Sequence, residues 1–181
     1  TVLGLIEVGV KDVGFGMVVS DKNAGDLLSL YRLCSLMGVE FATSTMHNSF
    51  YFHKRDNKIE DVDFTIQRMK EFIRALLGSQ RKNLRLKIKD WGRAYINYGL
   101  TRYMMGEVRS LPCGAATDLF FLDPYGFVLA CNGSEEPWIM GDLKEQNFEQ
   151  IWNSPKTEEV RQRVKDCKRD CWMVGTAVPA M

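Results

Sequence analysis

Four of the five cysteines of this chain lie between residues 113 and 171, and no other feature constrains the fold of that region as strongly. Cys113 and Cys131 stand at the two ends of a predicted hairpin, and Cys167 and Cys171 follow a predicted charged helix. Four thiolates are the ligands of a tetrahedral zinc ion or of an iron–sulfur cluster. The sequence therefore predicts a four-thiolate metal site formed by Cys113, Cys131, Cys167 and Cys171.

The turn between the first two cysteines supports this pairing. Two apolar runs, residues 119–122 and 127–130, flank the sequence Asp123-Pro124-Tyr125-Gly126. Asp at the first position, Pro at the second and Gly at the fourth are typical of a type I turn. An antiparallel hairpin would bring both thiols to one end. Aromatic cover for a buried metal group could come from Phe120, Phe127, Trp138 and Trp172.

The second pair of cysteines follows a helix with clear boundaries. Ser154-Pro155 is an N-cap with proline at the first helical position, and the helix should end near Asp166, just before Cys167. A capping box spanning Asn147–Gln150 predicts a short helix ahead of it.

The first half of the chain predicts a strand, a helix and a second strand. Val13–Ser20 is an almost continuous apolar run, which is typical of a strand buried on both faces. Asn23 is a candidate N-cap and Gly38 a candidate helix end, and Val39–Thr45 follows as a strand. Such a βαβ unit places its two strands parallel.

Ligands of parallel sheets bind at the carboxyl ends of the strands. Ser20, Asp21 and Asn23 follow the first strand, either as an ordinary turn and cap or as part of a cofactor pocket. His47 and His53 follow the second strand, where a structural role is more usual than metal ligation.

Two long helical stretches and a change of pattern complete the organisation. Asp63 is a candidate cap of a helix that ends at Gly78, and residues 83–107 are helical in pattern, with Gly99 as a candidate break. We divide the chain near residues 108–112, into a first domain of residues 1–110 and a second of residues 111–181.

Charge and cysteine usage limit the classes of partner and compartment. Lys and Arg number 24 and Asp and Glu 23, a net charge of +1, which gives no indication of nucleic acid or an anionic membrane as partner. No apolar run approaches the roughly 20 residues of a membrane span. The odd number of cysteines and the lack of a secretory signal favour reduced thiols or metal ligation in the cytoplasm. Because the first residue is Thr1 and not methionine, we expect a processed chain or a fragment.

The C-terminal pattern resembles the SPASM/twitch domain of radical S-adenosylmethionine enzymes. Cys113, Gly126 and Cys131 match its opening Cys…Gly-x4-Cys element, and Met140–Leu143 with Phe148–Trp152 resemble a later segment. The resemblance covers about residues 108–175. Upstream, residues 18–24 look like a late strand of the barrel in the same enzymes, and the strand that contains Phe41 would be the last.

This resemblance implies the fold class: an α/β chain with the last strands and helices of a partial (β/α)6 barrel, followed by a small α+β twitch-like module with a β-hairpin. It also implies an auxiliary [4Fe–4S] cluster, with S-adenosylmethionine and a second [4Fe–4S] cluster bound by the full-length parent. This sequence lacks the Cys-x3-Cys-x2-Cys motif that initiates radical chemistry, and one cysteine pair in the tail fits the shorter twitch form. The chain should therefore be inactive alone.

The expected function is electron transfer by an auxiliary cluster of an oxidoreductase or maturase that modifies a peptide or a small metabolite. The alternative is a zinc-stapled structural or interaction domain, in which the metal contributes only folding free energy. An incomplete barrel leaves a sheet edge and an apolar face uncovered, so we also expect self-association through that surface.

Overall fold

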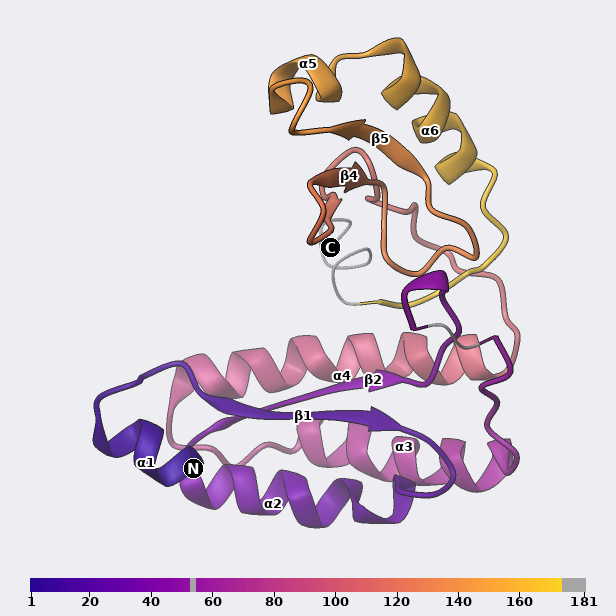
Figure 1. The fold of residues 1–181 in the computed structure, drawn as a ribbon. Coiled ribbons are helices and arrows are strands. Elements are labelled where there is room, and N and C mark those ends of the chain that lie inside the picture. The colour runs from indigo at the N-terminus through magenta and orange to yellow at the C-terminus, as the bar shows by residue number, and fades with distance from the viewer. Residues whose placement is uncertain (53–54, 174–181) are drawn as a thin grey trace. The chain divides into compact units, whose positions relative to one another are not determined.

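The computed structural model describes residues 1–52 and 55–173 and contains two compact units (Figure 1). Unit 1 comprises Thr1–Met46 and Ile59–Glu107, and unit 2 comprises His47–Lys58 and Val108–Met181. The prediction for His53 lies outside the described residues.

Unit 1 contains a parallel two-stranded sheet and helices, as the βαβ prediction required. Phe15 of β1 pairs with Phe41 of β2, and the register continues to Val19 and Thr45. The elements in chain order are α1 (Val2–Glu7), β1 (Gly14–Val19), the 3-10 helix η1 (Ala24–Asp26), α2 (Leu27–Met37), β2 (Glu40–Thr45), α3 (Val62–Leu77) and α4 (Leu84–Met104).

The prediction that the first strand is buried on both faces is wrong. Exposure alternates along β1: Gly14, Gly16 and Val18 are exposed, whereas Val19 is fully buried. Only one face of the sheet packs into the core of unit 1, and the other carries mainly small side chains. An apolar run that includes two glycines does not distinguish these cases, because glycine adds no side chain to either face.

Two predicted helix caps also shift. Asn23 does not cap α2; its side chain bonds the loop instead, and Asp26 precedes the helix. Asp61, not Asp63, caps α3 by accepting a hydrogen bond from the Phe64 amide at 2.9 Å. α4 continues through Gly99, because a single glycine costs only about 1 kcal/mol in a helix that tertiary packing supports.

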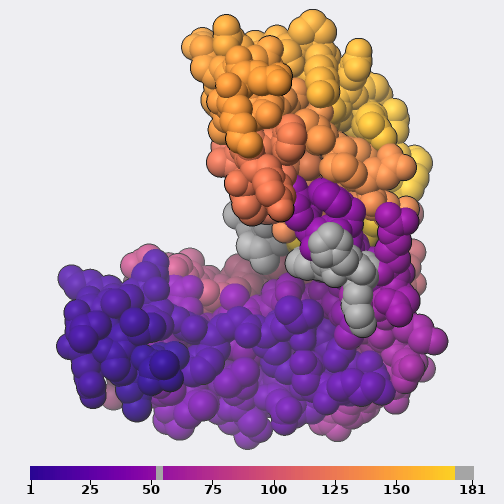
Figure 2. Space-filling model, viewed as in Figure 1, coloured from indigo at the N-terminus to yellow at the C-terminus, as the bar shows by residue number. Residues whose placement is uncertain are grey.

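Large side chains and one buried charge pair stabilise the core of unit 1. The Phe72 ring packs edge-on against Tyr31 and Phe41, with centroids 5.6 and 5.5 Å apart. Asp90 is fully buried, and its Oδ2 accepts hydrogen bonds from Tyr31, Ser79 and Arg81 at 2.7–2.9 Å. α1 buries none of its residues and lies at one end of the unit (Figure 2).

Unit 2 is built on the predicted hairpin. Its antiparallel sheet has the order β3-β4-β5, and the turn is closed by the Gly126 amide donating to the Asp123 carbonyl at 3.2 Å, with Gly126 at a φ of 95°. The elements are the 3-10 helix η2 (Phe50–Phe52), β3 (Phe121–Leu122), β4 (Phe127–Leu129), β5 (Ile139–Asp142), α5 (Phe148–Trp152) and α6 (Pro155–Lys165).

The two C-terminal helices confirm the predicted caps. Asn147 and Gln150 form a reciprocal capping box at α5, and the Ser154 hydroxyl accepts from the Thr157 amide at 3.1 Å before Pro155 opens α6. α5 packs so closely on β5 that a Cβ at Gly141 would stand 2.6 Å from Ile151. Most of the buried side chains of this core are alanine or valine, and two are larger: Ala115, Ala116, Val128, Ala130, Met140, Ile151, Val160 and Val164.

The observed fold is mixed α/β with small sheets, which is compatible with the expected α+β module. Among the described residues the sheet of unit 1 has two strands, and the partial barrel stays a prediction. None of the described helices combines the length and the apolar character that a membrane crossing requires.

Candidate metal centre

All four C-terminal cysteines line one cavity in unit 2. None of them forms a disulfide, and each is partly buried. The structure thus brings together the two pairs that the sequence places far apart. The other lining residues are Ala115, Gly133, Ser134, Trp138, Val164, Arg169 and Met173.

The first pair is placed by the hairpin and the loop before it. Cys131 lies two residues after the end of β4, and the Ala130 amide between them donates to the Trp138 carbonyl at 3.1 Å. Cys113 enters a tight loop in which the Gly114 carbonyl accepts from the amides of Asp118 and Leu119 at 2.8 and 3.1 Å. Both thiols pack against the small-residue core of unit 2.

The second pair is placed by the end of α6 and the irregular segment after it. The Cys167 amide donates to the Val164 carbonyl at 3.2 Å, and Asp170 has a left-handed φ of 50°. Arg109 holds this segment: its Nη1 donates to the Cys171 carbonyl at 2.8 Å, and its amide donates to Asp170 Oδ1 at 3.1 Å.

The thiols are close enough to influence one another electrostatically. Burial raises the pKa of the Cys171 thiol most, and Cys113, Cys131 and Cys167 raise it further, whereas Arg109 lowers it. Ionising the thiols in this cavity therefore builds up like charges in a poorly solvated space. A bound cationic metal group would supply the missing positive charge and favour the thiolate form.

The chemistry of its sulfur donors and of its lining makes the cavity suitable for a thiolate-bound metal group. Four sulfur ligands are available, and Ala115, Trp138 and Val164 provide apolar surroundings. In residues 1–52 and 55–173, no three His, Cys, Asp or Glu side chains are arranged to hold a single metal ion.

The predicted aromatic cover is only partly observed. Trp138 lines the cavity, and Trp172 is buried at 2% exposure but is not among the lining residues. Phe120 is 43% exposed and packs against Phe148 and Trp152 instead, with centroids 4.7 and 6.1 Å away. The sequence showed that Phe120 lies close to the predicted turn, but it did not indicate the contacts of Phe120 with α5.

Two polar residues of the cavity were not anticipated. Ser134 is 1% exposed, and its hydroxyl has no hydrogen-bond partner within the described part of the chain. Arg169 donates from Nη2 to the Asn48 carbonyl at 2.7 Å and pairs with Glu135 at 3.5 Å. A single serine three positions after Cys131 follows no motif that would have marked it.

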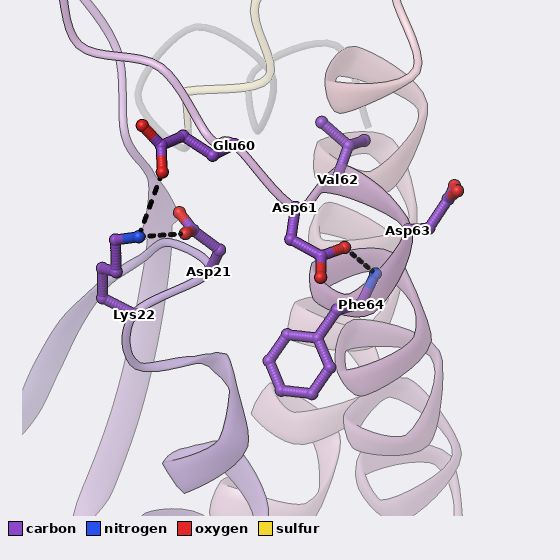
Figure 3. A pocket seen from close by; sticks show the side chains of 7 residues that line it. All are labelled: Asp21, Lys22, Glu60, Asp61, Val62, Asp63 and Phe64. Carbon is purple, nitrogen blue, oxygen red and sulfur yellow. Dashed lines mark hydrogen bonds and ion pairs between the residues drawn. The ribbon is translucent and has the colours of Figure 1, made fainter.

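The three residues predicted at the end of β1 form a loop in unit 1. Asn23 Oδ1 accepts from the Ser20 amide at 2.9 Å, and Asn23 Nδ2 donates to the Val18 carbonyl at 2.9 Å. Asp21 alone of the three lines the neighbouring hollow, together with residues before and within the start of α3 (Figure 3). The cofactor role of Ser20, Asp21 and Asn23 stays a prediction.

The hollow at the end of β1 is predominantly acidic. Lys22 Nζ lies 2.9 Å from Asp21 and 3.2 Å from Glu60, as Figure 3 shows. The hydrogen bond from Lys22 lowers the pKa of the Asp21 carboxyl, and these two carboxylates raise the pKa of Lys22. Asp61 is occupied as the cap of α3.

His47 belongs to unit 2 and is not among the residues lining the thiol cavity. Its carbonyl accepts from the Asn57 side chain at 3.3 Å, within a loop that the Asn48 side chain also holds by accepting from the Asn57 amide at 2.9 Å. The His47 backbone therefore has a structural role in this loop.

Comparison with known proteins bears on the thiol cavity alone. No curated protein and no solved structure matches the chain. A protein-family model does match, over residues 113–172, which run from the first cysteine of the cavity to the residue after the last. Within this chain, that segment is therefore similar to the family described as the SPASM iron–sulfur cluster-binding domain.

Proposed function

We propose that unit 2 is an auxiliary iron–sulfur module whose cluster is ligated by Cys113, Cys131, Cys167 and Cys171. One observation carries this proposal: the four thiols converge on one cavity from the hairpin and from the end of α6. The family match over the same segment indicates iron–sulfur rather than another thiolate-bound group. Four cysteines can ligate a [2Fe–2S] or a [4Fe–4S] cluster, and we propose the [4Fe–4S] type, which the resemblance to the SPASM/twitch domain implies.

A fully cysteine-ligated cluster supplies one-electron transfer. The protein's own contribution is to hold the thiols and to surround them with low polarity, as Ala115, Trp138 and Val164 do. Arg109 adds a positive charge near Cys171 and fixes the carbonyl of that residue. We infer a role in passing electrons to or from a reacting substrate bound elsewhere.

We further propose that the parent activity is that of a radical S-adenosylmethionine enzyme acting on a peptide or a small metabolite. The parallel β1-α2-β2 unit, with a polar loop after β1, is what the end of such a barrel would require. S-adenosylmethionine and a radical-initiating cluster would be bound by the full-length parent. The reduced state of all five cysteines suits the cytoplasm.

The first experiment tests cluster binding in the complete chain. Protein reconstituted anaerobically with iron and sulfide should show broad visible absorbance and contain about four iron and four sulfide ions per chain, the content of one [4Fe–4S] cluster. Serine substitution of Cys113, Cys131, Cys167 or Cys171 should each lower the iron content several-fold, because each removes one of four ligands.

Cys34→Ser is the matched control, because Cys34 is a fully buried cysteine of α2 that does not line the cavity. This variant should retain its iron. A colourless protein that holds one zinc ion would refute the cluster assignment and support the zinc-stapled alternative. Unchanged iron content in the four cavity variants would show that these thiols are not the ligands.

A further inference from the structure

Ser134 is a buried hydroxyl without a hydrogen-bond partner at the thiol cavity. The side chain is 1% exposed, its Oγ has no partner among the described residues, and it lines the cavity with the four cysteines. Burying a hydroxyl without a partner destabilises a fold, and most such groups in proteins are paired. An acceptor in the cavity would resolve this unpaired state.

The backbone around Ser134 is fixed on both sides, so its hydroxyl is held beside the cavity. The Ser134 carbonyl accepts from the Phe50 amide at 3.3 Å. The preceding Gly133 lies so close to Met173 that a Cβ there would stand 3.0 Å from its sulfur. The following Glu135 pairs with Arg169, which also lines the cavity.

We propose that the Ser134 hydroxyl donates a hydrogen bond to a sulfur atom of the cysteine-ligated cluster and raises its reduction potential. The inference rests on the proposed iron–sulfur function. A serine hydroxyl carries one donor proton, and the sulfur atoms of a cluster bear negative charge that increases on reduction. A donor therefore stabilises the reduced form more than the oxidised form, as hydrogen bonds to cluster sulfurs generally do.

The test compares reduction potentials of the complete chain, reconstituted anaerobically, by potentiometric titration followed by electron paramagnetic resonance. Ser134→Ala should keep its iron, but the reduction potential of its cluster should fall. The expected fall is at most about 59 mV, which corresponds to a tenfold change in the one-electron equilibrium. Ser49→Ala is the matched control: Ser49 is 2% exposed, and its hydroxyl also has no hydrogen-bond partner in the described part of the chain, but it does not line the cavity. Its potential should equal that of the wild type.

A second pair of variants isolates the hydroxyl from the side-chain volume. Ser134→Thr retains the hydroxyl and Ser134→Val replaces it with a methyl group of similar shape, so only the valine variant should show the lower potential. Equal potentials in the threonine and valine variants, with full iron content, would overturn the role of Ser134 and leave the cluster assignment intact. Absence of iron in the wild-type protein would overturn the proposed function and this inference together.

Discussion

The two units of this protein achieve burial by different means. The core of unit 1 consists of large side chains, including Phe41, Met69 and Phe72, and it also contains the fully buried Asp90. The core of unit 2 is mostly alanine and valine, with Met140 and Ile151 as its larger members; Cys113 and Cys131 pack against it, and its sheet has three short strands. Such a core removes less apolar area from water than one built around phenylalanine rings. We infer that unit 2 depends on its metal group for stability and that unit 1 does not.

Removal of the metal group should have the largest effect and should separate the two units. Metal binding at a structural thiolate site contributes roughly 10–16 kcal/mol in small zinc domains, so unit 2 should lose most of its protection when the group is removed. Hydrogen exchange read by mass spectrometry should show rapid exchange at β4 and β5 and unchanged protection in α3. Equal loss of protection in both units would refute the comparison.

Substitution of Asp90 should be the most damaging single change in unit 1. Asp90→Ala leaves Arg81, whose side chain is 3% exposed, without its carboxylate partner, and such losses typically cost about 3–5 kcal/mol. Chemical denaturation monitored by circular dichroism would measure the loss. Glu158→Ala is the control in unit 2, because Glu158 is 65% exposed in its pair with Arg161 and should cost less than about 1 kcal/mol.

A pair of glycine substitutions compares packing in the two units. Gly141→Ala should destabilise unit 2 by about 1–3 kcal/mol, because the new Cβ would meet Ile151 at 2.6 Å. Gly92→Ala should stabilise α4 by up to about 1 kcal/mol, since alanine favours a helix and, among the described residues, no atom beyond the local helix backbone and the two chain neighbours lies within 4 Å of the new Cβ. Thermal unfolding of both variants checks the opposite signs. A destabilised Gly92→Ala protein would show that α4 is not packed as described.

The acid dependence of unit 1 should be the smallest effect. Burial raises the pKa of Glu40, but hydrogen bonds from Lys89 and Arg93 outweigh it and bring the pKa below its ordinary value of 4.5. The unfolded chain then takes up this proton first, so the contribution is present above about pH 4.5 and is lost as the pH falls through the lower folded pKa.

In Glu40→Gln, the free energy of unfolding should therefore decrease less on acidification than in the wild type. The difference should be about 1 kcal/mol or less, as measured by denaturation at a series of pH values. Asp12→Asn is the control, because Asp12 is 72% exposed and 4.0 Å from Lys89. If Glu40→Gln and the wild type lost stability equally on acidification, the lowered pKa of Glu40 would be contradicted.

Local signals in the sequence predicted much of unit 2. The Asp123–Gly126 turn, the capping box at Asn147 and the Ser154 cap are each formed by neighbouring residues, and all three are present. The hairpin predicted that Cys113 and Cys131 lie close together, since antiparallel strands bring their ends together. The position of Cys167 and Cys171 depends on where α6 packs.

The contacts that the sequence did not indicate are long-range. Arg109 donates a hydrogen bond to the Cys171 carbonyl, and Arg169 donates one to the Asn48 carbonyl; the partners are 62 and 121 residues apart in the sequence. No periodicity or capping rule relates such residues, because their pairing depends on tertiary structure. The caps of α2 and α3 were misplaced for a simpler reason: Asn23, Asp26, Asp61 and Asp63 are all suitable cap types, and local sequence does not choose among them.

The membership of His47–Lys58 in unit 2 has a consequence for how the chain folds. Neither unit is a continuous stretch of sequence, since Ile59–Glu107 returns to unit 1 before the chain completes unit 2. Unit 2 must therefore close a long loop before Phe50 can reach the Ser134 carbonyl. If α3 and α4 form first, they shorten that loop and reduce the entropy lost in closing it. The early helices would then set the order of assembly, with the thiol cavity among the last parts to form.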